Sequence, residues 1–428
     1  MKPYLVVLLM LLPSAAAGQE PASDLAAYLR AARAHSPALR AAAARLRAAL
    51  TVPEQRSALP DPEASIGYTN DGTSGLTLGE REDARLSFGW RQEVPYPGKR
   101  RTAGESASFE AEAVEHELER LRLEVDSEVK TAFADLYRLD RTAVVLHETR
   151  TLLTSFAQSA SRRYEAGEGI QENILKAQTE IVRLDTEIER VAQERRAAGL
   201  RLEAAIGRPA DGPIGTAASL PPADLSPDLE ALAGAVADEA PEIGALAAAA
   251  RRAEAEVRLA RLGLKPDFVW SAAYDHRGGL DPMIGGMFGV RLPLYRRHKQ
   301  AQALRQAEWE LEAARHDLAD RRIRLRSEAL ELVSRARRAE RLIALIGQGV
   351  IPQARGALES ARASYGVGRL PLLDVLGDLK VLLEARIALA AQEADRFQSL
   401  AALEALLDRP LIPGLDDSAQ GGDHVDAP

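Results

Sequence analysis

The stretch "ARLSFGWRQEVPYPGKRRTAGESASFE", Ala84 to Glu110, joins two different structural patterns. Its first part alternates apolar and polar residues, which is the period of a half-buried β-strand. Its end belongs to a run from Glu105 to Ala166 that contains no glycine or proline. A continuous helix over that run would measure roughly 90 Å. The sequence therefore predicts a short strand that leads directly into a very long helix.

The junction between the two patterns is rich in proline. Pro95, Tyr96, Pro97 and Gly98 separate strand from helix, and Pro293 follows the corresponding strand later in the chain. Proline ends strand pairing because it has no N–H, and the fixed φ of Pro97 beside Gly98 suits the turn into a helix. We expect these residues to form the crossing between a β part and a helical part.

The same layout occurs twice in the chain. "RRYEAGEGIQENILKAQ" (162–178) matches "RASYGVGRLPLLDVLGD" (362–378), with Tyr164 opposite Tyr365 and Gly167 opposite Gly368. "AAIGRPA" and "ALLDRPL" match further along at the same offset. Several ordered matches at nearly constant spacing indicate a tandem duplication.

The duplication defines the expected organisation. Residues 1–17 resemble a secretory signal, with Lys2, an apolar core and a small-residue cleavage site. We expect a first repeat at 18–206, a connector at 207–228, a second repeat at 229–410 and a disordered tail at 411–428. Each repeat should contain a short helix, a β-hairpin (62–92 and 267–292) and a long helical hairpin (98–206 and 294–407). In the second copy, Gly347, Gly349 and Pro352 predict a break in the long helix.

The long helix also carries an apolar stripe. Residues at intervals of three and four indicate coiled-coil-like packing along one side: Val114, Leu118, Leu121, Val125, Val129, Ala132, Leu136 and Leu139.

Four segments show the alternation of a strand. Their apolar positions are Ala64, Ile66, Tyr68; Ala84, Leu86, Phe88, Trp90; Phe268, Trp270, Ala272, Tyr274; and Ile284, Phe288, Val290, Leu292. This pattern is typical of membrane-spanning strands around a polar lumen, although two half-buried hairpins on a soluble domain would show it as well. Four strands cannot close a barrel, so membrane strands would require several protomers to pool them. Three protomers would supply twelve.

Composition excludes several other functions. The chain has no cysteine and a formal net charge of -8, which argues against thiolate metal sites and nucleic-acid partners. No phosphate loop, GxSxG or HExxH motif is present, so we expect no enzyme. His116 and His316 lie beside acidic residues, but we interpret them as solvated helix residues and predict neither a metal site nor a cofactor.

The duplicated Tyr-x-x-Gly turns, followed by "ENILKAQ" and "LDVLGDL", resemble the TolC family of outer-membrane efflux proteins over roughly Asp24 to Pro410. The junction "RQEVPYPGKR" is similar to the heavy-metal (CusC/CzcC-like) RND branch. The resemblance implies a mainly α fold with a small membrane β part. Long helical hairpins would form an α-barrel in a homotrimer, and four strands per protomer would enter a shared 12-stranded transmembrane β-barrel. It also implies an outer-membrane location with a periplasmic helical extension, in contact with lipid, a periplasmic adaptor (membrane fusion protein) and an inner-membrane RND-type transporter.

The resemblance also assigns candidate site residues. The hairpin tips would contact the adaptor: Ala166, Gly167, Glu168, Val367, Gly368 and Arg369. Acidic residues after the second tip would form a pore gate, and Asp374 matches the first of them. The second position is Gly377, and the first-copy counterpart of Asp374 is Asn173, so a double acidic ring is not complete here.

The function implied is efflux of metal cations or other small molecules delivered by the pump through the adaptor. Two alternatives stay open on the sequence alone. One is the outer-membrane duct of type I protein secretion, and the other is an exported coiled-coil scaffold without a pore.

Overall fold

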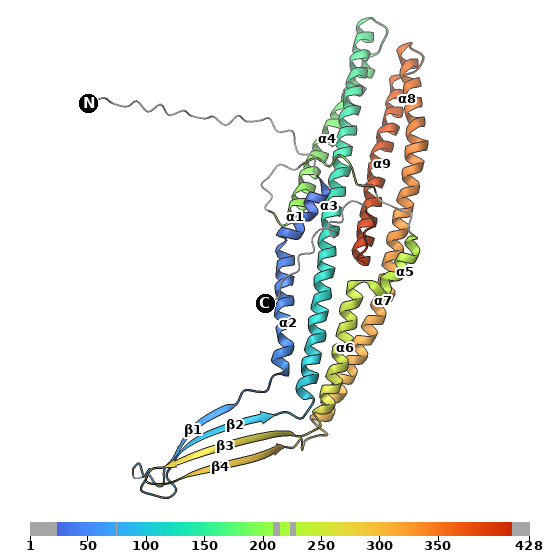
Figure 1. Ribbon diagram of the computed structural model, residues 1–428. Helices are drawn as coiled ribbons and strands as arrows, with labels where there is room; N and C mark the ends of the chain where they lie inside the picture. Colours follow the sequence, from blue (N-terminus) through green and yellow to red (C-terminus); the bar gives the residue numbers. More distant parts are fainter. Residues whose placement is uncertain (1–23, 74, 209–214, 223–227, 413–428) are drawn as a thin grey trace, which may run out of the picture.

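The computed structural model describes residues 24–73, 75–208, 215–222 and 228–412. The expected signal peptide, much of the connector and nearly all of the expected tail lie outside these residues. The described chain forms a long, bent body with a small sheet at one end and two helical hairpin tips at the other (Figure 1).

Both halves of the chain have the same order of elements. The first half contains α1 (Leu25–His35), α2 (Pro37–Ser57), β1 (Glu63–Thr69), β2 (Arg85–Val94), α3 (Lys99–Glu165) and α4 (Gln171–Ile206). The second contains α5 (Leu229–Glu239), α6 (Pro241–Leu262), β3 (Asp267–Arg277), β4 (Leu280–Arg291), α7 (Gln300–Ala344), the π-helix η1 (Leu345–Val350), α8 (Ile351–Gly366) and α9 (Leu372–Leu407).

Proline divides the short helices at equivalent places. Pro37 and Pro241 are the first residues of α2 and α6, where a missing N–H costs no helical hydrogen bond. The Ser36 hydroxyl also caps α2 by accepting from the Leu39 N–H at 3.4 Å. The break between α1 and α2 therefore follows from local sequence.

The predicted stripe on the first long helix is confirmed. Of its eight positions, Leu118, Val125, Val129, Leu136 and Leu139 are buried, and the other three are partly buried. The stripe packs because α3 runs the whole length of the body and contacts α2, α4, α6 and α9.

The predicted break in the second long helix coincides with an interruption of the α-helix by the π-helix η1, but the helical run does not end there. The helical run continues from α7 through η1 into α8, and it begins at Gln300 rather than Leu294 because residues 294–299 form turns. Pro352 cannot donate to a carbonyl one turn earlier, and a π-helical turn accommodates this mismatch without ending the helix.

The four strands form one antiparallel sheet in the order β1-β2-β3-β4. The registers align the apolar positions: Ile66 lies opposite Phe88, Phe88 opposite Tyr274, and Tyr274 opposite Ile284. All four alternating patterns therefore place their apolar residues on one face of the sheet. The opposite face carries polar, charged and small residues, including Ser65, Arg91, Ser271 and Gly285.

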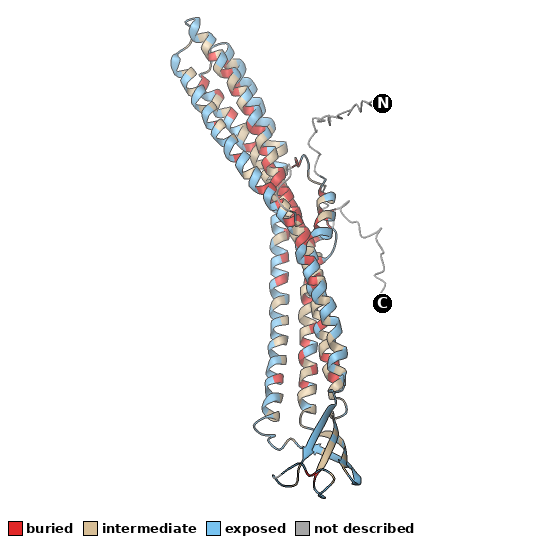
Figure 2. Ribbon diagram, turned by 90° about the vertical axis from the view of Figure 1, so that its left-hand side faces the viewer, coloured by how far each residue is buried: buried red, intermediate tan, exposed pale blue. Residues whose placement is uncertain are grey.

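The helices are arranged in the same lateral order as the strands. Near the sheet the order is α2, α3, α6, α7, and toward the tips it is α4, α3, α9, α8. Apart from α1 and α5, which pack against α3 and α7, the helices and strands form a single layer along a bent body (Figure 2), and one edge continues from β1 through α2 to α4. The other edge continues from β4 through α7 to α8.

One buried and one partly buried ion pair link helices in the middle of the layer. Lys130 Nζ on α3 lies 2.7 Å from Glu404 Oε2 on α9, and Arg33 on α1 binds both oxygens of Asp126. Burial raises the pKa of the Glu404 carboxyl, while the nearby ammonium of Lys130 lowers it in part. Two helix turns further along α3, burial and the neighbouring Glu393 raise the pKa of Tyr137 to about 12.

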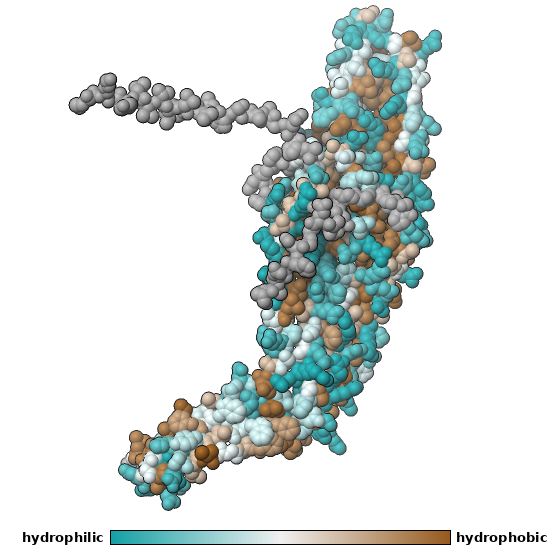
Figure 3. Space-filling view, viewed as in Figure 1, coloured by the Kyte–Doolittle hydropathy of each residue, from teal (hydrophilic) through white to brown (hydrophobic). Residues whose placement is uncertain are grey.

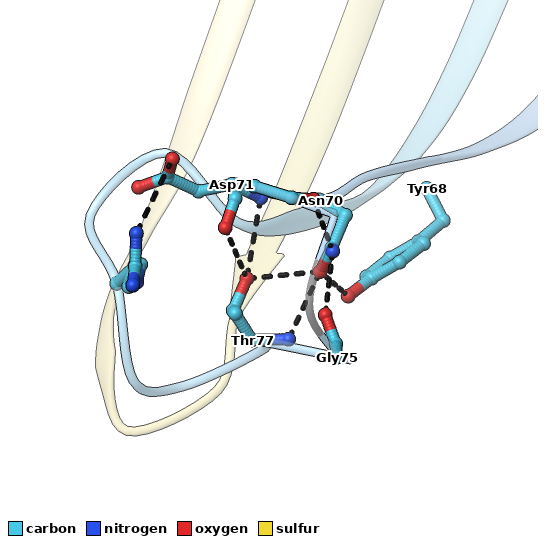
Figure 4. Close-up of polar contacts among 7 residues, drawn as sticks. Tyr68, Asn70, Asp71, Gly75 and Thr77 are labelled. Atoms are coloured by element: carbon cyan, nitrogen blue, oxygen red, sulfur yellow. Dashed lines mark hydrogen bonds and ion pairs between the residues drawn. The ribbon is translucent and has the colours of Figure 1, made fainter.

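The loop between β1 and β2 is organised around one side chain. Asn70 Oδ1 accepts hydrogen bonds from the Tyr68 hydroxyl (2.5 Å) and from the Thr77 N–H and hydroxyl (both 2.9 Å), as Figure 4 shows. Its amide donates to the Gly75 carbonyl at 2.6 Å. The loop then reaches the second repeat, where Arg277 donates to the Glu82 carbonyl at 2.8 Å.

Candidate functional site

The two tips have the same backbone geometry. Gly167 and Gly368 have φ of 74° and 77°, a left-handed conformation that glycine adopts without a steric penalty. The Gly167 N–H donates to the Tyr164 carbonyl, and the Gly368 N–H donates to the Tyr365 carbonyl, both at 3.0 Å. The next N–H in each tip reaches one residue further back, which is the Schellman arrangement at a helix C-terminus. Local sequence therefore fixes both turns.

The structure brings the two tips together. Apolar residues from both hairpins form one core just behind the turns, including Phe156, Ala177, Leu358 and Val375. Arg163 of α3 extends to Tyr365 of α8: it donates to the Tyr365 carbonyl, and its guanidinium lies 5.2 Å from the centre of the ring. An open groove of about 500 Å³ lies between the hairpins and is lined by residues of both.

The predicted tip residues lie at the end of the body and are all exposed: Ala166, Gly167, Glu168, Val367, Gly368 and Arg369. Val367 is the most apolar of them, with 70% of its surface exposed. These positions are therefore accessible to another macromolecule.

The predicted gate residues occupy equivalent places. Asp374 is an exposed residue in the first turn of α9, and Asn173 is a partly exposed residue in the first turn of α4. An acidic residue is favourable at a helix N-terminus. Among the described residues, Asp374 forms no ion pair, so its charge faces solvent.

The predicted junction is held by a residue from the other repeat. Asp267, the first residue of β3, accepts from the Tyr96 N–H and from Lys99 Nζ, both at 2.7 Å. Gly98 has a φ of 97° and precedes α3. Pro95, Pro97 and Pro293 lie in the same crossing, between strand and helix. The carboxylate of Asp267 therefore links the start of α3 to the start of β3.

His116 and His316 lie on different helices and pair with acids of their own helix. His116 Nδ1 lies 3.0 Å from Glu119 Oε2, and His316 Nε2 lies 3.9 Å from Glu312 Oε1. In the part of the chain that the structure describes, no group of three or more metal-ligating side chains is gathered.

Apolar side chains are exposed at the sheet end of the body (Figure 3). Ile66, Trp270, Ile284 and Phe288 each have more than half of their surface accessible. None of the helices in the described residues combines the length and apolar character that a membrane-spanning helix needs.

Comparison with known proteins agrees with this geometry. The family model described as "Outer membrane efflux protein" matches residues 28–208 and 232–409, one match in each repeat. The chain belongs to this family. The predicted TolC-like relationship is thereby confirmed, and the family is one of transport channels rather than enzymes.

Solved structures similar to this efflux protein share its fold. The outer membrane protein VceC from Vibrio cholerae has a TM-score of 0.76 and 23% identity, with 90% of this chain and 95% of VceC covered. CusC has a TM-score of 0.75 and 15% identity, with 90% and 91% covered. The open state of the MtrE channel of Neisseria gonorrhoeae has a TM-score of 0.68 and 18% identity, with 90% and 88% covered. The comparison with curated proteins returned no match.

Two contacts of this efflux protein were not predicted from the sequence. Arg163 with Tyr365 and Asp267 with Lys99 each join the two repeats. Alignment of the repeats could have pointed to Asp267, since "LPDPEAS" and "LKPDFVW" both place an aspartate at or just before the start of a strand. We find no sequence signal for the partner of Arg163.

Proposed function

We propose that this protein is the outer-membrane channel of a tripartite efflux system and works as a homotrimer. The observation that carries the proposal is the single curved layer with two unpartnered edges, which run through both the sheet and the helices. A layer with different surfaces at its two edges associates head to tail, and such contacts close into a ring when the rotation allows it.

The sheet supports a shared barrel. Within the described residues β1 and β4 each pair on one side only, which leaves a row of backbone N–H and C=O groups without partners. Pairing β4 of one protomer with β1 of the next would satisfy them. Three copies would give 12 strands, with the apolar face toward lipid and the polar face toward the lumen.

The helical edges support the same ring. Trp309, Ile323 and Leu330 lie at multiples of seven residues along α7, and their exposed fractions are 68%, 72% and 41%. On the opposite edge, Leu50 of α2 and Val182 of α4 are exposed by 59% and 64%. Mutual burial of these two apolar edges between neighbouring protomers would stabilise a tube of helices. This tube would form the periplasmic extension of the channel.

The exposed tips suit a partner at the far end of the tube. We propose that the six tip residues contact a periplasmic adaptor, which connects the channel to an inner-membrane RND-type transporter. Three-fold symmetry would gather three Asp374 carboxylates near the axis, with Asn173 in the equivalent first-repeat positions. Such a ring attracts cations.

For the substrate, we propose metal cations or other small molecules. The junction motif's similarity to the heavy-metal branch supports metal export. The exposed apolar face of the sheet and the family match argue against a scaffold without a pore.

The experiment is reconstitution. Protein purified in detergent should migrate as a trimer and give discrete conductance steps in planar bilayers. As a matched pair, Ile284→Lys on the apolar sheet face should destabilise the inserted protein, and Ser271→Lys on the polar face should not. A monomer that stays dissolved without detergent and gives no conductance would contradict the proposal.

A further inference from the structure

We propose that Asp61 of one protomer binds Arg297 of the next protomer, and that this ion pair fixes the register in which β4 pairs with the neighbouring β1. The inference rests on the proposed homotrimer. It adds the residues and the strand register of the contact between protomers, both of which follow from the internal duplication of the chain.

The two repeats can be aligned at both ends of their β-hairpins. Asp61 and Asp267 each lie at or just before the start of the first strand, and Pro95 and Pro293 each follow the second strand. The proline alignment makes Arg297 the counterpart of a lysine in the first repeat, Lys99. Each hairpin is thus flanked by an acidic residue before it and a basic residue after it.

The strand pairing supports this alignment. Glu63 lies opposite Arg91 in the first hairpin, and their counterparts Val269 and Gly289 lie opposite each other in the second. The two hairpins therefore have the same register. A contact between the first and second repeats of one chain can be transferred to the contact between the second repeat and the first repeat of the next chain.

Within one chain, the two repeats are already joined by the equivalent ion pair. Asp267, at the start of β3, lies 2.7 Å from Nζ of Lys99, which follows β2. Asp61 and Arg297 lie beside β1 and β4, which are the two outer strands of the sheet, so they cannot form this pair within one protomer. In a closed ring, β4 of each protomer meets β1 of the next, and the pair would form between chains.

Both members of the proposed pair are available. Asp61 and Arg297 are exposed, and within the described parts of the chain neither side chain forms an ion pair. Arg297 also lies just before α7, whose first turn contains no acidic residue. A carboxylate from the neighbour would therefore be favoured by the guanidinium and by the helix N-terminus. The side chains of Lys99 and Asp267 are only 16% and 20% exposed, so we expect the equivalent pair between chains to be shielded from water as well.

The same transfer predicts the register of the strands. Glu93 lies opposite Val269 where β2 pairs with β3, and the counterparts of these two residues are Arg291 and Glu63. We therefore expect Arg291 to lie opposite Glu63 of the neighbouring protomer, which places opposite charges across from each other. This charge match was not used to derive the register, so it supports the register independently.

The apolar face is continuous in this register as well. Trp90 lies opposite Ala272, which predicts Phe288 opposite Ile66 of the neighbour. A slip by one residue would place apolar and polar side chains on the same face. A slip by two residues would keep the faces but would move Glu63 away from Arg291.

Introduced cysteines test the register, because the chain has none of its own. In the proposed register Ser65 lies opposite Gly289 of the neighbour, and a Cβ at Gly289 makes only ordinary contacts. Oxidation of Ser65→Cys/Gly289→Cys should therefore give covalently linked trimers on a non-reducing gel. Ser65→Cys/Met287→Cys is the matched control, since a diagonal pair of strand residues is too far apart for an unstrained disulfide.

Charge-swap variants test the ion pair in the detergent-solubilised trimer. Asp61→Arg and Arg297→Asp should each make protomers exchange about tenfold faster between differently labelled trimers, as for loss of one charge-assisted hydrogen bond per interface. The double variant Asp61→Arg/Arg297→Asp should exchange nearly as slowly as the wild type, because it restores the pair with reversed polarity. Asp281→Arg makes the same charge change at an exposed position near the start of β4 and should have no effect.

Each result decides one part of the proposal. Equal exchange rates in all of these proteins, or a double variant as fast as the single ones, would overturn the ion pair. Cross-linking through Met287→Cys instead of Gly289→Cys would overturn the register. Cross-linked trimers that give no conductance in planar bilayers would support the contact and contradict the proposed channel function. Normal conductance without a cross-link at Gly289→Cys would overturn the contact and leave the channel function standing.

Discussion

Replacing Lys130 by methionine would remove one half of the ion pair between α3 and α9. The two side chains are 7% and 11% exposed and lie 2.7 Å apart, so the Glu404 carboxylate would stay buried without its counter-ion. Breaking such a pair costs about 3–5 kcal/mol. For a chain of this length that unfolds cooperatively, the unfolding entropy is roughly 0.9 kcal/mol per kelvin, so the midpoint should fall by about 3–5 °C.

The double variant Lys130→Met/Glu404→Leu distinguishes the loss of the ion pair itself from the cost of leaving one charge buried alone. Removal of both charges avoids the isolated buried carboxylate, so we expect most of the loss to be recovered. Lys380→Met on α9 is the matched control, because Lys380 and Glu384 are 72% and 65% exposed and lie 3.8 Å apart. An exposed pair of this kind contributes about 0–1 kcal/mol.

The raised pKa of Glu404 fixes the direction in which folding stability changes with pH. The pKa of Glu404 is raised above its usual value of 4.5 in the folded chain, so its ionised form costs stability above the folded pKa. That cost disappears as the pH falls toward the unfolded value, because the folded chain then binds the proton. Lys130→Met raises the pKa of Glu404 further. The loss of stability in this variant, relative to the wild type, should therefore shrink between pH 7 and pH 5. Thermal melts followed by circular dichroism measure this. A midpoint equal to wild type, or a deficit that grows on acidification, would refute the reasoning.

Three further outcomes follow from other parts of the molecule. Ile284→Lys places a charge on the apolar sheet face and should cost about 2–4 kcal/mol if that face meets lipid near the midplane, which urea unfolding from vesicles measures against Ser271→Lys. Asp267→Ala leaves the Tyr96 N–H without its acceptor and Lys99 without its ionic partner, and should cost about 1–3 kcal/mol; equal melting of this variant and the exposed control Asp281→Ala would contradict that. Asp374→Asn should lower the preference for cations in reversal-potential measurements, and an unchanged reversal potential would remove Asp374 from the gate.

Periodicity was sufficient to predict much of the fold. The strand patterns alternate over enough residues to identify their apolar faces, and the stripe from Leu118 to Leu139 repeats often enough to indicate a packed helix. The duplication located both tips, because glycine at Gly167 and Gly368 is tied to a specific backbone conformation. Each of these features depends on residues that are close together in the sequence, so it can be predicted from a short segment alone.

The features that sequence reasoning missed depend on distant residues. Pairing of β2 with β3 joins the two repeats, and nothing within either strand specifies the partner. The contacts of Arg163 and of Asp267 reach across about 200 and 170 residues. The π-helix was missed because the glycines and proline of "GQGVIP" favour a break when considered alone, whereas packing of α7 and α8 along α9 favours continuation.

The unbroken course of each edge from strand to helix has a consequence in cells that produce two versions of this chain. In the proposed trimer, a copy with damage confined to one edge keeps an intact surface on the other, so it would still join a normal neighbour. The damaged edge would then leave one interface of the trimer unsealed, along both the strands and the helices. We expect such variants to be dominant over the wild type, whereas chains that fail to fold should be recessive.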